Sequence, residues 1–297
     1  MESVMTRFAI GDITVSAIWE MEDTSFRMKS FFPLVTEEML AREQTWLTPT
    51  YHDPDTDQIK LSIHAWLIDT GRHKILVDTC VGNDKQRHAR KQWSDLNTPF
   101  LERLRAAGVE PEAIDYVCCT HLHADHVGWN TRLIDGRWVP TFPNARYIFG
   151  RKEYDYWAEK YGSDPGSHHL AAYSDSVLPV VETGQVVLVD DGYELDGCLT
   201  FKPAPGHTPG HVAIWLHSNG RECVFSGDII HHPIQLAYPQ LSCMGCEDPA
   251  QSVRTRSALL AGIADTETML MTGHFLAPHA AHIETAGECF RVRCSEC

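Results

Sequence analysis

Three histidines and an aspartate lie within six residues of this chain, directly after an apolar run. The run covers residues 114–120, and the cluster is His121-Leu122-His123-Ala124-Asp125-His126. A short apolar run bounded by polar residues is typical of a buried strand. Imidazoles and a carboxylate are costly to bury without partners, and they are the donors that suit zinc and neighbouring first-row metals. The cluster therefore predicts a metal site at a strand end. A polar loop that is merely rich in histidine is the less satisfactory alternative.

The spacing within the cluster separates it into two parts. On a strand end or extended loop, His121 and His123 point the same way because side chains alternate with period two. These two side chains can therefore share one metal ion. Asp125 and His126 lie beyond the turn, and they can face a second ion beside the first.

Three later segments repeat one pattern, in which an apolar strand is followed by a glycine and then by a ligand-type side chain. They are Gly206-His207, Gly227-Asp228 and Gly273-His274. Glycine allows the close backbone approach that a crowded site needs. One such dipeptide is weak evidence, but three of them beside the histidine cluster indicate one shared site.

The donors divide into two groups that share one carboxylate. The first group is His121, His123 and His207, the second is Asp125, His126 and His274, and Asp228 can bridge both with its two oxygens. Each group keeps an open position, which distinguishes a catalytic from a structural metal site. The expected cofactor is a pair of divalent ions, zinc first, with manganese, iron or cobalt as alternatives.

Charge and hydropathy restrict the partners of the protein. The 297 residues carry a formal net charge of −15, and an acidic surface repels phosphate backbones, so nucleic acid is not an expected partner. The densest basic stretch, residues 85–91, is expected to be a solvated face. No apolar run reaches the roughly 20 residues of a membrane helix, and the N-terminus lacks a secretory signal pattern. We therefore expect a cytoplasmic protein, without membrane contacts, that acts on a small molecule.

The 10 cysteines are expected to be mostly thiols in that compartment. Cys243-Met244-Gly245-Cys246 is a CxxC sequence, and Cys289, Cys294 and Cys297 lie together near the C-terminus. A structural zinc ion held by four of them is one interpretation. Free thiols are the favoured one, because the paired CxxC spacing of a strong zinc motif is missing.

The expected elements follow the order β-rich, α, β-rich, α. Strands are expected at residues 10–19, 59–68, 74–77, 114–120, 146–149, 186–189, 198–202, 212–216, 222–225 and 268–271, and helices at about 36–44, 99–107, 152–160 and 248–261. Asn219-Gly220 suits a hairpin turn because both residues accept positive φ. Two sheets packed face to face with helices outside, in one α/β domain over residues 1–297, would satisfy this order.

Residues 20–58 form a long stretch between strands, which is often a functional lid or arm. Its aromatic side chains include Phe31, Phe32 and Trp46. They suit a substrate entrance or a homodimer contact between two copies of the chain. Simple packing on the core is an equal alternative.

The motif residues resemble the metallo-β-lactamase superfamily. The matching pattern is His121-x-His123-x-Asp125-His126, followed by His207, Asp228 and His274 in that order. The resemblance covers about residues 59–274, and it implies an αββα sandwich of two mixed sheets with helices on the outer faces. It also implies that Asp78, in Val77-Asp78-Thr79, supports the site without binding metal.

Asp125 together with His126 resembles the branches that fill both metal positions, namely the lactonases, glyoxalase II and the organophosphate hydrolases. True β-lactamases usually alter one of these positions or place a cysteine where Asp228 stands. The arm at residues 20–58 and the segment Val127-Gly128-Trp129-Asn130 resemble the lactonase and methyl-parathion-hydrolase-like group. Quorum-quenching lactonases place a tyrosine shortly after the bridging aspartate, whereas Ile229-Ile230-His231-His232 stands here. The resemblance therefore does not single out an acyl-homoserine lactone as substrate.

Hydrolysis of an ester-like bond, in a lactone or a carboxylic ester, is the expected reaction, with a metal-bridging hydroxide as nucleophile. The ion of the second group stabilises the developing oxyanion, and Asp125 is the expected catalytic residue that passes a proton to the leaving alkoxide. Phosphotriester and thioester hydrolysis are alternatives. A non-catalytic metal-binding sensor or binding module is the alternative from a different class, although such proteins usually lose ligands.

Three further histidines are expected around the metal ligands. His211 is expected behind them, because the ligand set is already full. One of His231 and His232 can face the substrate and donate to its carbonyl. A polar pair in a loop is the alternative for these two residues.

Overall fold

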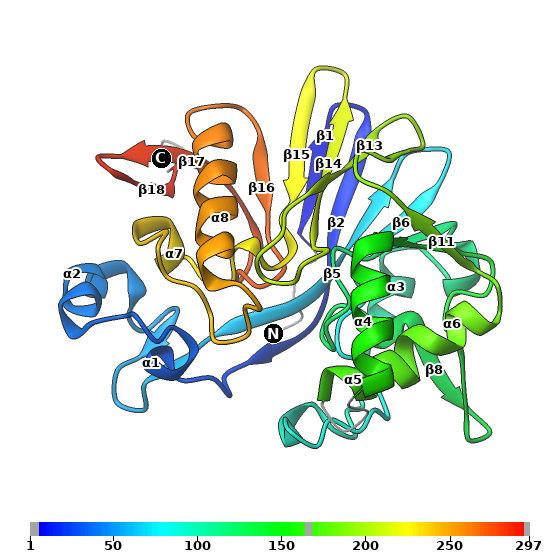
Figure 1. Ribbon diagram of the computed structural model, residues 1–297. Coiled ribbons are helices and arrows are strands. Elements are labelled where there is room, and N and C mark those ends of the chain that lie inside the picture. The colour runs from blue at the N-terminus through cyan, green and yellow to red at the C-terminus, as the bar shows by residue number, and fades with distance from the viewer. Residues whose placement is uncertain (1–5, 164–167, 294–297) are drawn as a thin grey trace.

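Two seven-stranded sheets form the centre of the fold in Figure 1, a computed structural model whose described residues are 6–163 and 168–293. The first sheet contains, in spatial order, β1 (Arg7–Ile10), β2 (Ile13–Asp23), β5 (Leu61–Asp69), β6 (Lys74–Val77), β7 (Tyr116–Cys118), β10 (Arg146–Gly150) and β11 (Val186–Val189). The second contains β12 (Glu194–Leu195), β13 (Leu199–Pro203), β14 (Val212–Ser218), β15 (Arg221–Phe225), β16 (Met269–Met271), β17 (Ala280–Ala286) and β18 (Cys289–Val292). Both sheets are mixed, because β6, β7, β10 and β11 pair in parallel, as do β15 and β16, while the other pairs are antiparallel.

Side chains of the strands alternate between two faces, as their period of two requires. In β15, Cys223 and Phe225 face an apolar layer shared by both sheets, and Val224 faces the opposite side. In β6, Val77 enters the same shared layer while Leu76 faces away from it. Each sheet therefore keeps an outer apolar face that must be covered.

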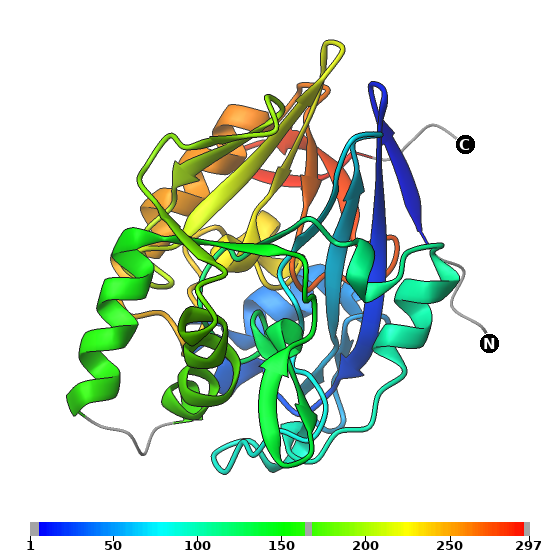
Figure 2. The same ribbon diagram turned by 90° about the vertical axis from the view of Figure 1, so that its right-hand side faces the viewer.

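Helices cover these outer faces (Figures 1 and 2). Leu260 and Ile263 of α8 (Pro249–Ile263) pack on the second sheet. The first sheet is covered by α3 (Phe100–Ala106), α4 (Arg151–Ser163) and α6 (Leu178–Glu182), with α5 (His168–Ala172) and a π-helical turn (Tyr173–Val177) between the last two. The predicted αββα arrangement is thereby confirmed. None of the helices in the described ranges is long and apolar enough to cross a membrane.

The expected strands and helices are present, with shifted ends. The strand expected at residues 10–19 is β2, and the helix expected at 99–107 begins at Phe100, with Pro99 at its N-cap. The hairpin turn between β14 and β15 is confirmed, because Asn219 and Gly220 have φ of 46° and 74°. The elements that were not predicted include β1, the hairpin of β8 (Thr131–Ile134) and β9 (Arg137–Pro140), α7 (Ile234–Ala237), and the pair β17–β18 after His274.

The arm begins later than predicted, because β2 continues to Asp23. It contains α1 (Met28–Phe31), α2 (Glu37–Leu47) and the short pair β3 (His52–Asp53) and β4 (Gln58–Ile59). Its phenylalanines Phe31 and Phe32 are buried in the cluster that covers the first sheet, whereas Trp46 is 38% exposed. Most of its aromatic side chains therefore pack on the core, and a contact between two copies of the chain stays a prediction.

The prediction of a solvated basic face is wrong for Lys85 and Arg87, whose side chains are fully buried. Arg87 donates to both carboxylate oxygens of Asp175, at 2.6 and 3.0 Å, and Lys85 Nζ lies 2.6 Å from Thr131 Oγ1. Buried charges are tolerated when they are paired. Asp175 lies 88 residues further along the chain, so the local charge pattern does not show it.

The loop after the histidine cluster runs against the loop after β6. A Cβ atom on Gly128 would lie 1.8 Å from the carbonyl oxygen of Val81. We therefore expect Gly128→Ala to lower the free energy of unfolding by about 1–3 kcal/mol or more in urea denaturation. Gly262→Ala in α8, where nothing lies within 4 Å, is the matched control and should be neutral or stabilising by up to about 1 kcal/mol. Equal unfolding midpoints for the two variants would contradict the tight contact.

Candidate metal centre

Strands from both sheets end at one place. β6 and β7 run parallel in the first sheet, and β15 and β16 run parallel in the second. The loop after β6 carries Asp78, and the loop after β7 carries the histidine cluster. The loops after β13, β15 and β16 carry His207, Asp228 and His274. The carboxyl ends of parallel strands share one edge of a sheet, so these side chains meet at the seam between the two sheets.

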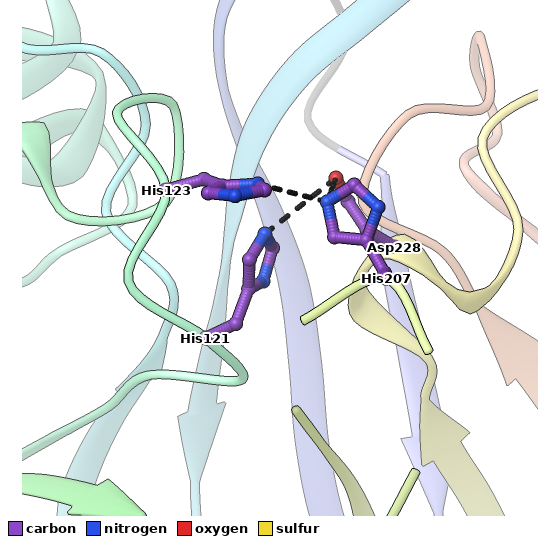
Figure 3. A group of neighbouring side chains, drawn as sticks. All are labelled: His121, His123, His207 and Asp228. Atoms are coloured by element: carbon purple, nitrogen blue, oxygen red, sulfur yellow. Dashed lines mark hydrogen bonds and ion pairs between the residues drawn. The ribbon is translucent and has the colours of Figure 1, made fainter. Parts of the chain in front are cut away.

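The first group predicted from the sequence comes together, and Figure 3 shows its rings beside the carboxylate. His121, His123, His207 and Asp228 each offer a ligand atom within 4.8 Å of the others, and all four are buried. His123 Nδ1 lies 2.8 Å from His207 Nε2. The Nε2 atoms of His121 and His207 lie 3.6 and 3.1 Å from Asp228 Oδ2.

The second predicted group lies on the other side of the same carboxylate. Asp125 Oδ2 lies 3.8 Å from His126 Nε2 and 3.6 Å from His274 Nε2. Asp228 Oδ1 lies 3.1 and 3.0 Å from the same two nitrogens. Asp228 therefore turns one oxygen toward each group, which is the bridging position expected from the sequence.

Contacts behind the rings fix their orientation. His126 Nδ1 lies 2.9 Å from Asp78 Oδ2, and His274 Nδ1 lies 3.0 Å from the carbonyl oxygen of Ser62. Asp78 is itself held, because its Oδ1 accepts a 2.8 Å hydrogen bond from the backbone N–H of Thr120. An acceptor at Nδ1 keeps the proton there and leaves the Nε2 lone pair facing the site.

The charges of the site are balanced among its own residues. Burial raises the pKa of Asp228, but the neighbouring histidines, His126 first, outweigh burial and hold this pKa well below its usual range. Burial lowers the pKa of both His126 and His207, but the Asp228 carboxylate outweighs it. The pKa of His126 lies well above its usual range, and that of His207 rises to about 10. The site therefore attracts positive charge, as protons or as cations.

Three atoms of the predicted ligands are buried and form no hydrogen bond of good geometry within the described chain, although each faces an oppositely charged ligand. They are His121 Nε2, His126 Nε2 and Asp228 Oδ1. Imidazole nitrogen and carboxylate oxygen donate lone pairs to first-row divalent cations. The donor set therefore fits two such cations, one in each group.

The remaining predicted histidines separate by position. His211 lies behind the ligands, where its Nε2 accepts a 3.1 Å hydrogen bond from the backbone N–H of Asp228. His231 lines the cavity beside the site, with Nε2 3.1 Å from Asp228 Oδ2. His232 does not line that cavity. Its Nε2 lies 3.3 Å from the carbonyl oxygen of Tyr51 in the arm.

Two buried glutamates that were not predicted hold the loops of the site. Glu153 of α4 accepts hydrogen bonds from Leu122 N at 3.0 Å and from Thr208 Oγ1 at 2.7 Å, so it joins the loops of the two sheets. Glu20 of β2 accepts from Val81 N at 2.8 Å. Burial raises the pKa of both carboxyl groups although these hydrogen bonds oppose it. No local pattern marks either residue, because each contacts the site only in the folded chain.

A cavity of about 380 Å³ opens onto both donor groups. One part of its wall is apolar and comes from the arm, from β5 and from two later loops, as Phe26, Phe31, Leu61, Ile63, Trp93 and Met244. A cation, Arg90, and a carboxylate, Glu247, also line the cavity, and the Arg90 guanidinium lies 4.1 Å from the ring centre of Phe26. The cavity therefore suits a ligand with an apolar part beside a polar reactive group.

Two mixed sheets with helices outside, and a histidine and aspartate centre at their seam, define a class of metal-dependent hydrolases. The chain belongs to the metallo-beta-lactamase superfamily, whose family model matches residues 59–274.

The chain is similar in sequence to known lactonases over part of its length. It is 32% identical to the N-acyl homoserine lactonase AttM of Azorhizobium caulinodans over 124 residues, which are 37% of this chain and 39% of the relative. It is 25% identical to an N-acyl homoserine lactonase of a Bacillus species over 172 residues, which are 54% of this chain and 60% of the relative. The chain thus spans less than two thirds of these relatives.

Solved structures resemble the chain along nearly its whole length. The hydrolase AbOPH of the beta-lactamase superfamily has a TM-score of 0.81 at 24% identity, covering 98% of this chain and 97% of that one. AidC, a dizinc quorum-quenching lactonase, has a TM-score of 0.74 at 21% identity, covering 99% and 98%. At these identities the likeness establishes the fold.

Asp78 should control metal affinity without binding the ion. Asp78→Asn keeps the size of the side chain but removes the charge behind His126, so we expect affinity for the ion of the second group to fall about 10- to 100-fold. Competition with a chromophoric chelator measures the metal affinity of the variant and of the parent protein. Asp190→Asn, at an exposed carboxylate, is the control and should bind as the parent does. Unchanged affinity in Asp78→Asn would contradict this role.

Metal binding should release protons, because a coordinated imidazole must be neutral while Asp228 holds the pKa of His126 and His207 high. Adding zinc to metal-free protein in weak buffer with a pH indicator measures the release. Affinity should rise as the pH increases from about 6 to 8, since fewer protons then compete. Asp228→Asn, which lacks the charge that raises these pKa values, should release fewer protons. Release of equal numbers of protons by the parent and by Asp228→Asn would contradict the effect of the Asp228 charge on the two histidines.

Proposed function

We propose that the protein is a dinuclear metal-dependent hydrolase that cleaves an ester-like bond, in a lactone or a carboxylic ester. The observation that carries the proposal is the complete donor set, in which one carboxylate faces two groups of three further ligands. A binding module does not need two open metal positions that share one carboxylate. The completeness of the set therefore favours an enzyme over a non-catalytic sensor.

His121, His123 and His207 would hold one ion, Asp125, His126 and His274 the other, and Asp228 both. Such a pair of ions, when bound, activates a water molecule and polarises the substrate oxygen. We propose zinc, because these donors suit it and because the structurally similar AidC is described as a dizinc lactonase. Manganese, iron or cobalt would suit the same donors.

Asp125 is the proposed proton carrier. It is the half-buried member of the second group, and it lines the cavity, so its carboxylate reaches both the ligand cluster and a substrate. From this position it can hand a proton to the leaving alkoxide. His231 also lines the cavity, and from there it can donate to a substrate carbonyl.

The cavity favours a neutral substrate with an apolar chain. Phe26, Phe31 and Trp93 form an aromatic wall, with the rings of Phe26 and Phe31 4.6 Å apart. An acyl chain that packs on this wall would bury apolar surface worth about 25 cal/mol per Å². Arg90 lies at the same wall and can pair with the carboxylate that ester hydrolysis produces.

Phosphotriester hydrolysis is the second candidate, and thioester hydrolysis uses the same site. The fold shared with the hydrolase AbOPH is consistent with either reaction, and the metal positions do not distinguish them. The apolar wall and the nearby cation favour the carboxylic ester or lactone.

Turnover of a substrate panel tests the proposal. The zinc-loaded protein should hydrolyse lactones and aryl esters, with kcat/KM rising as the acyl chain lengthens, and should act less on a phosphotriester, a thioester and a β-lactam.

Asp228→Ala should bind fewer ions and lose at least about 10²-fold in kcat, because it removes a ligand of both groups. Asp190→Ala is the matched surface control. Full metal content and full turnover in Asp228→Ala would refute the bridging role, and two bound ions without turnover of any substrate would favour a binding module.

A further inference from the structure

A pair of cysteines lies in the wall of the cavity. Cys243 and Cys246 both line it, and their sulfur atoms are 3.6 Å apart. They occupy the ends of a four-residue turn that is closed by a 3.2 Å hydrogen bond from Cys246 N to the carbonyl oxygen of Cys243. Cys243 is buried and Cys246 is partly exposed, so a reagent in the cavity can reach the pair.

The turn is held on both sides. Met244 N donates to the carbonyl oxygen of Phe31 in the arm at 2.8 Å. Glu247 N donates to the carbonyl oxygen of His207 at 2.9 Å. The sulfur atoms are therefore kept close to each other and close to the metal-ligand loop by backbone contacts that do not involve the thiols.

The same sulfur atoms lie behind His207. Cys246 Sγ is 3.6 Å and Cys243 Sγ is 3.8 Å from His207 Nδ1, and Cys243 Sγ is 3.5 Å from His231 Nε2. His126 and His274 have oxygen acceptors at Nδ1, from Asp78 and Ser62. His207 has sulfur there instead, so the oxidation state of the cysteines changes the acceptor behind one ligand.

We infer that Cys243 and Cys246 are a redox modification site, forming a reversible disulfide that weakens metal binding at the His207 group. The oxidant is a small-molecule disulfide. The sulfur of Cys246 attacks one of its sulfur atoms and releases the first thiol, and Cys243 then attacks Cys246 of the mixed disulfide and releases the second. The two cysteines lose two electrons and two protons, and the small-molecule disulfide takes up both and becomes two thiols.

The geometry favours a disulfide over a third metal ion at this place. A disulfide needs the sulfur atoms to approach from 3.6 Å to about 2.05 Å, a small movement within one turn. A third ion held by Cys243, His207 and His231 would compete for His231 Nε2, which already lies 3.1 Å from Asp228 Oδ2. A sulfur in a disulfide bond is also a poorer acceptor for His207 Nδ1–H than the sulfur of a reduced cysteine.

The experiment treats the zinc-loaded protein with oxidised glutathione and then with dithiothreitol. Peptide mapping should find Cys243 linked to Cys246, and free thiols should fall by two relative to the untreated protein. Desalting should then remove part of the bound zinc, and kcat/KM for the best ester should fall about tenfold or more. Dithiothreitol followed by zinc should reverse all of these changes.

Cys243→Ser and Cys246→Ser should keep the same zinc content and the same kcat/KM before and after oxidant, whatever their starting values. Cys289→Ser, at a partly exposed thiol outside the cavity, is the matched control and should respond as the parent does. The inference is overturned if no Cys243–Cys246 link forms. It is also overturned if zinc loss is the same in Cys246→Ser, or if a third equivalent of zinc shields both thiols.

The effect on kcat/KM rests on the proposed hydrolase function, whereas the disulfide and the loss of zinc do not. A protein that forms the link and releases zinc but turns over no substrate would refute the function and keep the redox site. A protein that hydrolyses esters and forms no Cys243–Cys246 disulfide would keep the proposed function and refute the redox site.

Discussion

The Asp228 carboxylate is the contact on which the rest of the structure depends. Each of its oxygens faces a different donor group, at 3.0 to 3.1 Å from the nearest imidazole nitrogens. This is possible only where the carboxyl end of β15 meets the loop after β7, so the two sheets must pack face to face. Packing of the two sheets against each other thus brings residues 121–126 to Asp228. The fold thereby holds seven donors at one place, the seam between the two sheets.

The parts that could be predicted from the sequence are those with a local signature. A glycine followed by a ligand-type residue at a strand end located His207, Asp228 and His274, and period-two alternation located most strands. The ends of elements were less predictable, because pairing decides them: β2 reaches Asp23 since it pairs along its length with β5. Glu153 and the buried Arg87 carry no local signature at all. Their partners Leu122 and Asp175 lie 31 and 88 residues away, so these contacts are evident only in the folded chain.

Chemistry and specificity come from different parts of the chain. The donors lie on loops that directly follow core strands, and their positions are fixed by buried contacts such as the one between Asp78 and His126. The cavity wall comes mainly from the arm and from the turn at residues 243–246. These segments lie outside the two sheets, although Phe31 and Phe32 anchor the arm on the first one. The metal ligands therefore indicate the family, because they form a sequence motif. The residues of the cavity wall, which would contact the substrate, form no such motif.

The sulfur contacts behind His207 make metal binding and thiol oxidation dependent on each other. If a disulfide between Cys243 and Cys246 lowers the affinity for the ion of the first group by some factor, a bound ion must disfavour that disulfide by the same factor, because the coupling of two equilibria is reciprocal. A factor of ten corresponds to about 1.4 kcal/mol, which for a two-electron couple is about 30 mV. The loaded protein should therefore resist oxidation more than the metal-free protein does. Metal supply and redox state would then act on one imidazole, His207, from its two sides.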